Sequence, residues 1–260
     1  MSRLPHLCSL EARIARLAAP PQQRGAAGVF ATGHAALDRS LGGGLAQGAV
    51  HELFAGSAED AGSAAGFALA LAWQAHRDRR LMWLRSDAAE RRTGQVYAPG
   101  LMELGLDPAR LILGRMPDEV ALLRAATDAL RCAALGAVVI ECPGRMRALD
   151  LTASRRLALA ARGSGVTALL LRSDADPVPS AAETRWAVSA AASAALEAQA
   201  PGAPRFAVEL LRRRSGPAGI RWCMEWDRNA CVFREAAAAE ALPGAVVSLP
   251  ERRPAQPVSA

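Results

Sequence analysis

The sequence predicts a three-layer α/β/α domain whose mainly parallel central sheet is extended by C-terminal antiparallel strands. Between Val29 and Arg172, short apolar runs without polar alternation are separated by helical segments, which is typical of a parallel sheet covered on both faces. After Arg172, apolar and polar residues alternate, as in antiparallel strands with one buried face. At 260 residues and 51% hydrophobic residues, the chain is large enough to bury such a core.

The parallel half of the sheet is predicted from five apolar runs and the helices between them. The strands are expected at Ala49–Phe54, Leu81–Arg85, Arg110–Leu113, Ala137–Cys142 and Val166–Leu171. The helices are expected at Ala64–His76, at Pro117–Leu135 with proline in its first turn, and from Asp150 or Thr152 to Arg162, before Gly163 and Gly165.

The antiparallel extension is predicted from period-two patterns. Trp222, Met224 and Trp226 lie two residues apart, so they share one face of a strand. The strands are expected at Thr184–Ala190, Arg205–Arg212, Arg221–Trp226 and Val232–Phe233, with turns at Gly216–Gly219 and Asp227–Asn229.

The two ends of the chain are expected to lie outside the main domain, which spans residues 28–235. Residues 5–18 form a predicted amphipathic helix, followed by a linker up to residue 27. This helix either packs on the domain, which we favour, or docks onto a partner. Residues 236–260 are rich in Ala, Pro and Arg, and a flexible tail is expected there.

Composition excludes several functions. The net charge is +6, and all 31 basic residues are arginine, because the chain contains no lysine. A Schiff-base lysine, a lysine base and the lysine of a phosphate loop are therefore absent, and a flat guanidinium is a poor substitute for that compact charge. The five cysteines form no C-x-x-C pair, so neither a zinc site nor a disulfide framework is expected. With no apolar run of membrane-spanning length and no signal peptide, a cytoplasmic protein without membrane contact is expected.

The most specific pattern lies near the start of the domain. Thr32–Asp38 leads to the glycine-rich Leu41–Leu45, and Gly48–Leu53 follows. Locally this is a tight glycine turn between apolar anchors, which needs no ligand. Its order and spacing resemble the opening of the RecA-type ATPase core, in which the first core strand ends at the phosphate loop. The resemblance implies a RecA-like fold.

The phosphate-loop position departs from a working G-x-x-x-x-G-K-[ST] motif. Aligning Gly56 with the first glycine places Ala61 at the second glycine, Gly62 at the lysine and Ser63 at the hydroxyl residue. The intervening Glu59 and Asp60 add negative charge where polyphosphate would lie, and each repulsion is of order ~4 kcal/mol before screening. This degenerate loop predicts that the protein binds neither nucleotide nor another cofactor.

Three carboxylates stand where a RecA-type ATPase would need them. Glu141 ends an apolar strand, at about the position that holds Mg²⁺ in the family. The catalytic carboxylate of the family follows the strand at Leu81–Arg85, and Asp87 and Glu90 are the nearby candidates. Without the lysine, we interpret all three as members of surface ion pairs with nearby arginines. Histidine lies in no nucleophile motif, so no catalytic residue and no metal site are expected.

Clustered arginines make nucleic acid a second possible ligand. The best candidate is the run Arg212, Arg213 and Arg214 at the end of a predicted strand. It is either a phosphate-binding cluster or a solvated hairpin tip in an arginine-rich protein, and the sequence favours neither.

Together with the ending Val208–Arg212 and Trp222–Asp227, these features resemble the ImuA family, RecA-like accessory proteins of the bacterial SOS mutasome. The resemblance covers roughly residues 28–234 and includes the segments Gly105–Pro108 and Thr184–Trp186. It adds no catalytic residue, in agreement with the missing lysine.

The resemblance implies a non-catalytic adaptor for error-prone translesion synthesis and SOS-induced mutagenesis. The implied partners are ImuB, an inactive relative of Y-family polymerases, an error-prone C-family polymerase reached through the complex, RecA, and DNA by a weak contact. The alternative is a SulA-like division inhibitor that acts by protein binding. The chain's length and fuller glycine-rich segment argue against that alternative, and the missing lysine argues against a working ATPase.

Overall fold

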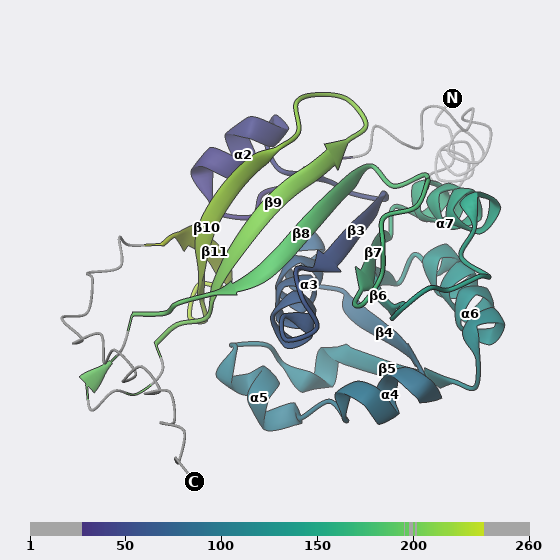
Figure 1. Cartoon of the computed structure of the whole chain (residues 1–260), viewed down its shortest axis with the longest axis horizontal. Coiled ribbons are helices and arrows are strands. Elements are labelled where there is room, and N and C mark those ends of the chain that lie inside the picture. Colours follow the sequence, from purple (N-terminus) through teal and green to yellow (C-terminus); the bar gives the residue numbers. More distant parts are fainter. Residues whose placement is uncertain (1–27, 195, 198–199, 201, 237–260) are drawn as a thin grey trace, which may run out of the picture.

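The computed structural model describes residues 28–194, 196–197, 200 and 202–236 (Figure 1). The predicted N-terminal helix at 5–18 and all but the first residue of the predicted tail at 236–260 lie outside the described residues. The described chain forms a nine-stranded mixed sheet in the order β11-β10-β9-β8-β3-β7-β6-β4-β5. The predicted mainly parallel core with C-terminal antiparallel strands is confirmed.

The sheet changes direction at β9. The strands that run parallel are β3 (Val50–Ala55), β4 (Arg80–Ser86), β5 (Leu111–Met116), β6 (Leu135–Glu141), β7 (Thr167–Arg172) and β8 (Thr184–Ala191). The antiparallel strands are β9 (Arg205–Arg213), β10 (Ile220–Asp227) and β11 (Val232–Glu235). We expected β8 within the antiparallel extension, but it pairs in parallel with β3 and antiparallel only with β9.

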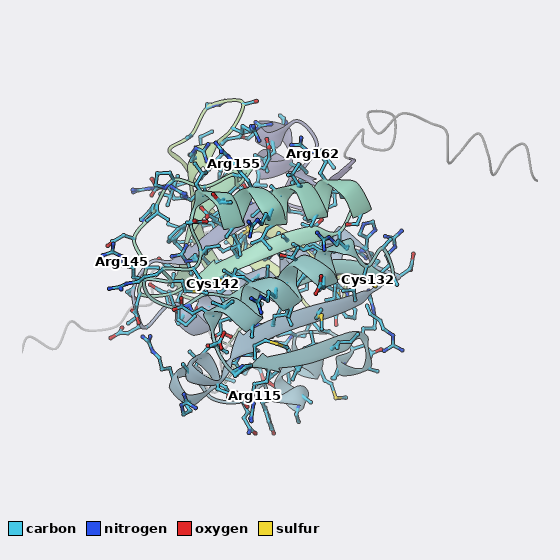
Figure 2. All side chains as sticks on the ribbon, turned by 90° about the vertical axis from the view of Figure 1, so that its right-hand side faces the viewer. Arg115, Cys132, Cys142, Arg145, Arg155 and Arg162 are labelled. Atoms are coloured by element: carbon cyan, nitrogen blue, oxygen red, sulfur yellow. The ribbon has the colours of Figure 1, made fainter. Side chains whose placement is uncertain are left out.

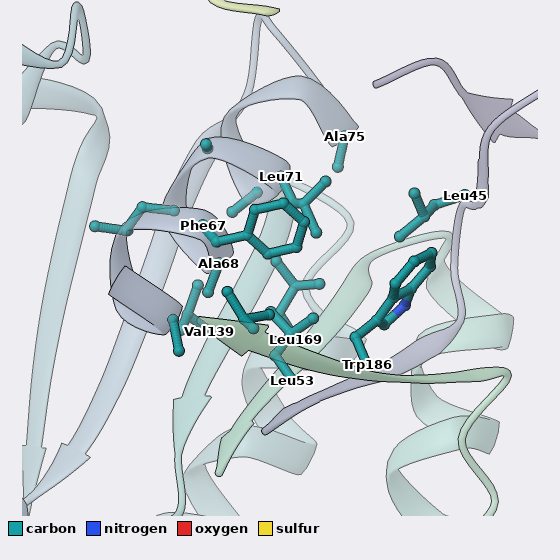
Figure 3. Close-up of a cluster of buried hydrophobic side chains, with 14 of the residues drawn as sticks. Leu45, Leu53, Phe67, Ala68, Leu71, Ala75, Val139, Leu169 and Trp186 are labelled. Atoms are coloured by element: carbon teal, nitrogen blue, oxygen red, sulfur yellow. The ribbon is translucent and has the colours of Figure 1, made fainter. Parts of the chain in front are cut away.

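Helices cover both faces of the parallel half. Helix α3 (Ala61–Ala75) packs on one face, and α6 (Glu119–Arg131) and α7 (Leu151–Ser164) pack on the other (Figure 1). On the α3 face, Phe67, Ala68 and Leu71 lie over Leu53, Val139 and Leu169 of the sheet (Figure 3). These strands are apolar on both faces because helices bury both of them.

The predicted helix at Pro117–Leu135 was too long at both ends. The helix begins after Asp118, whose side chain accepts a hydrogen bond from the Ala121 amide at 2.8 Å as an N-cap. It ends at Arg131, and Leu135 already belongs to β6. Sequence patterns also missed several short elements: β1 (Val29–Phe30), α2 (Ala35–Leu41), β2 (Leu45–Ala46), α4 (Asp87–Thr93), α5 (Ala98–Glu103) and the 3-10 turn η2 (Pro108–Arg110).

The glycine-rich opening of the domain folds around one carboxylate. The two oxygens of Asp38 accept hydrogen bonds from the backbone and hydroxyl of Thr32, both at 2.8 Å, and from the Gly33 amide at 3.0 Å. The Phe233 amide of β11 donates to the Thr32 carbonyl at 2.9 Å. The motif therefore joins the start of the domain to its last strand.

None of the helices described above is long and apolar enough to cross a membrane. Within the same described residues, no group of three or more His, Cys, Asp and Glu side chains is arranged to hold a metal ion.

Candidate functional site

The degenerate phosphate loop lies at the carboxyl end of β3, between that strand and α3. Its Gly56 amide donates to the Val188 carbonyl of β8 at 2.9 Å. The Asp60 carboxylate accepts hydrogen bonds from the Ala190 amide at 2.7 Å and the Ser57 hydroxyl at 2.8 Å. The Ala190 amide and the Ser57 hydroxyl both lower the pKa of Asp60. The loop is thus anchored to β8 through a carboxylate that is kept ionised.

The residues aligned with the end of a phosphate loop form the first turn of α3. Ala61, Gly62 and Ser63 lie there in sequence, as the alignment implies, and no cation is among them. A β-carbon built on Gly62 would meet no atom within 4 Å, so the surroundings do not require glycine at this position. The position lacks the positive charge of lysine. The neighbouring Glu59 is exposed at the same loop.

Glu141, the carboxylate at the magnesium position, is buried in an ion pair. Its Oε2 lies 2.6 Å from Nε of Arg85 on the adjacent strand β4, and Thr93 donates to its Oε1 at 3.1 Å. Arg85 also donates to the Gly94 carbonyl at 2.8 Å. The expected surface pair is wrong for Glu141, because β4 and β6 are neighbours in the sheet and both Glu141 and Arg85 are buried.

This pairing limits what Glu141 can do. Both carboxylate oxygens already accept hydrogen bonds, from Arg85 and Thr93, so a water-bound Mg²⁺ would compete with these neighbours for the carboxylate. Removing one partner of a buried ion pair lowers protein stability by about 3–5 kcal/mol, because the other charge stays buried without a partner. Asp87 and Glu90 of α4 pair with the exposed Arg115 of β5, at 2.8 and 3.3 Å.

A cleft of about 600 Å³ extends from the first turn of α3 toward α5. Most of its lining is apolar, including Trp83, Leu101 and Leu171. Its two cations are Arg85, which pairs with Glu141, and Arg92, which pairs with Asp174. A polyphosphate would therefore meet cations that are already neutralised by carboxylates.

A second buried ion pair, which no sequence motif predicted, joins strands β3 and β8. Arg185 contacts Glu52 at 2.7 Å, and the guanidinium groups of Arg185 and Arg172 each lie 5.5 Å from the ring centre of Phe54. The available signal was the presence of Glu52, Arg172 and Glu141 within otherwise apolar strands. Side chains of this kind are rarely buried without partners, so each of them is expected to have a polar or charged partner.

The predicted nucleic-acid cluster is divided between two sides of the structure. Arg213 donates to the Ser40 and Leu41 carbonyls at 3.0 and 2.8 Å, at the carboxyl end of α2. Arg212 and Arg214 are exposed and line a groove beside α7. The three arginines therefore do not form one contiguous cluster.

Fold and site together define the class: a RecA-like α/β protein whose phosphate-loop position lacks lysine. Among solved structures, the crystal structure of the RadB recombinase is similar, with a TM-score of 0.54 and 16% identity over 80% of this chain and 100% of that chain. At this identity the similarity concerns the fold alone.

Sequence comparison identifies the family. No family model matches the chain. Two curated relatives are 34% identical over 193 residues, which span 68% of this chain and 75% of each relative. Both are Protein ImuA, from Caulobacter vibrioides strains NA1000 / CB15N and ATCC 19089 / CIP 103742 / CB 15. The chain belongs to the ImuA family, and the family resemblance predicted from its motifs is confirmed.

Proposed function

We propose that the protein is a non-catalytic RecA-like adaptor that supports SOS-induced, error-prone translesion DNA synthesis. Membership of the ImuA family supports the pathway. The phosphate-loop position supports the absence of catalysis, because Gly62 replaces lysine, Glu59 and Asp60 repel phosphate, and Glu141 is held by Arg85. This loop is the observation that carries the proposal.

In this role the chain binds an ImuB-type inactive Y-family polymerase relative and, through the complex, an error-prone C-family polymerase. RecA is a further proposed partner. Assembly with these partners is driven by protein contacts alone and does not depend on nucleotide hydrolysis. Co-elution of the purified chain with the ImuB-type protein of the same genome, in size-exclusion chromatography without nucleotide, tests this assignment. Association that occurs only with ATP and Mg²⁺ would contradict it.

Calorimetry tests the absence of nucleotide binding directly. Titration of the full chain with ATP and Mg²⁺ should give no saturable heat, and ATP should leave the melting temperature unchanged, because only a ligand that binds the folded state raises it. A micromolar dissociation constant, about −8 kcal/mol, would overturn the non-catalytic assignment.

A genetic experiment tests the pathway. Deleting the gene should reduce the frequency of ultraviolet-induced rifampicin-resistant mutants, and the wild-type chain should restore it. The Ser63→Ala variant should restore it equally, because the remaining hydroxyl of the loop has no nucleotide to bind. Normal induced mutagenesis with altered filamentation after damage would instead support a division inhibitor.

A further inference from the structure

A basic groove runs beside helix α7, away from the phosphate-loop position. It has a volume of about 340 Å³ and lies between α7, the segment Ser180–Ala182, and Arg212 and Arg214 at the end of β9. Helix α7 contributes Arg155 and Arg162, which lie on the face of the molecule seen in Figure 2. Four arginines from two elements thus converge on one groove.

The four arginines lack carboxylate partners. Within the part of the chain that the structure describes, none of Arg155, Arg162, Arg212 and Arg214 forms an ion pair, and no acidic residue lines the groove. By contrast, Arg205, at the other end of β9, pairs with Glu225 at 2.7 Å. The groove therefore carries a positive charge that a negatively charged ligand would complement.

The groove also has an apolar component. Leu151, Arg155, Leu159 and Arg162 follow one another at steps of four, four and three, so they share one face of α7. Leu159 is 69% exposed and Leu151 is 37% exposed. The exposed helix face thus alternates between aliphatic and cationic residues, and both kinds line the groove.

Hydrogen bonds hold the opposite wall of the groove in place. The Ala181 amide donates to the hydroxyl of the buried Ser154 on α7 at 2.8 Å. The backbone amide of Arg214 donates to the Glu183 carbonyl at 2.9 Å. Because these bonds join the wall both to α7 and to the end of β9, a ligand would find the groove already formed, which lowers the entropic cost of binding.

We propose that this groove binds an acidic segment of a partner protein that also carries aliphatic side chains. Its carboxylates would lie against the four arginines, and its aliphatic side chains against Leu151 and Leu159. A protein segment is favoured over single-stranded nucleic acid, because sites for single strands stack bases on aromatic side chains and the groove lining has none. The inference rests on the proposed function in one respect, since an adaptor requires such a docking surface.

Fluorescence anisotropy tests the groove with probes of defined chemistry. The main probe is a labelled peptide in which Asp and Glu alternate with Leu. Matched probes replace Leu by Ser, or Asp and Glu by Asn and Gln, and a labelled oligothymidylate represents nucleic acid. The main peptide should bind saturably to the full chain, and the uncharged and leucine-free peptides should bind on the order of tenfold less tightly.

Paired charge reversals locate the binding surface. The variant Arg155→Glu with Arg214→Glu should weaken binding of the main peptide by on the order of tenfold. The control Arg124→Glu with Arg156→Glu changes the net charge equally on the neighbouring α6–α7 surface and should leave binding unchanged. Leu159→Ser, a change at an exposed side chain, should weaken binding without lowering the melting temperature.

Three outcomes would overturn the proposal: no saturable binding of the main peptide, equal weakening by both charge-reversal pairs, or preferential binding of oligothymidylate that is lost in the groove variant. The last outcome would instead assign the groove to nucleic acid. ATP binding is measured on the same preparations by calorimetry. The peptide titrations therefore test the groove proposal, and the ATP titration separately tests the non-catalytic adaptor role.

Discussion

At the scale of single residues, a buried histidine connects the start of the domain to the sheet. Nε2 of His51 lies 2.9 Å from the Ala46 carbonyl, and Nδ1 lies 2.7 Å from the Thr184 hydroxyl. Trp186 donates its indole N–H to the same hydroxyl at 2.6 Å. Because a carbonyl oxygen only accepts hydrogen bonds, Nε2 of His51 carries the ring proton. Nδ1 then accepts a hydrogen bond from the Thr184 hydroxyl, and the neutral ring leaves none of these polar atoms without a partner.

Burial lowers the pKa of His51 from 6.5 to about 4. The unfolded chain therefore binds a proton more readily than the folded one between these two values. The contribution to stability is complete above pH 6.5 and is lost as the pH falls; at about pH 4 the loss amounts to roughly 3 kcal/mol. Urea unfolding across this range should show the loss. The His51→Gln variant should show a shallower pH dependence, and an identical slope in both proteins would contradict the assignment.

Cysteine reactivity should separate buried from exposed thiols. Burial raises the pKa of Cys142 to about 12, whereas Cys132 and Cys223 are exposed. Because the thiolate is the reactive species, a disulfide reagent should modify Cys132 and Cys223 rapidly in the folded protein. Cys142 should react only after unfolding, as measured by mass spectrometry of the labelled peptides. A Cys142→Ala variant should leave the rapid phase unchanged.

At the scale of elements, the loop that carries Thr32 and Gly33 depends on the absence of a side chain. Gly33 has a φ of +90°, and a β-carbon there would lie 2.7 Å from the Val232 side chain and 2.8 Å from the Phe233 carbonyl. Gly33→Ala should therefore destabilise the protein by about 1–3 kcal/mol and separate the loop from β11. Chemical denaturation measures the loss.

Gly62→Ala is a suitable control for this prediction, because a β-carbon at Gly62 meets no atom within 4 Å and the position is already helical. That variant should be as stable as the wild type or slightly more stable. A loss of stability at Gly62 equal to that at Gly33 would show that glycine substitution itself, rather than the contact with β11, is responsible.

At the scale of the whole molecule, one hydrophobic cluster joins the parallel core to the antiparallel extension. Phe67 of α3 lies 5.0 Å from Phe233 of β11, measured between ring centres, and Trp226 of β10 also lies 5.0 Å from Phe233. The same cluster includes Leu53 and Val139 of the parallel strands. The extension is thus part of one core rather than a separate unit.

Unfolding should accordingly be a single cooperative transition. Tryptophan fluorescence, which reports on Trp226 in the extension and on Trp83 in the parallel half, should change at the same denaturant concentration as far-ultraviolet circular dichroism. Phe233→Ala should lower the stability by about 3–5 kcal/mol and shift both signals together. Two separate transitions in either protein would show that the extension folds independently.

The order of the major elements could be predicted from local patterns, because periodicity and chain punctuation are properties of short segments. The apolar runs at Ala137–Cys142 and Val166–Leu171 predicted β6 and β7 to within about two residues. Short helices such as α4 escaped prediction, because Ser86 caps α4 from the end of a strand and the helix has too few turns to show a periodic face.

By itself, the sequence determined the fold class, the family and the missing lysine, since each depends on residue types in a fixed order. Only the tertiary structure decided which charges meet. Glu141 pairs with Arg85, 56 residues away, because β4 and β6 are neighbours in the sheet. Arg213 separates from Arg212 and Arg214 because successive residues of a strand point to opposite faces and only one face lies against α2. Long-range pairing and side-chain direction arise from packing, which no local pattern encodes.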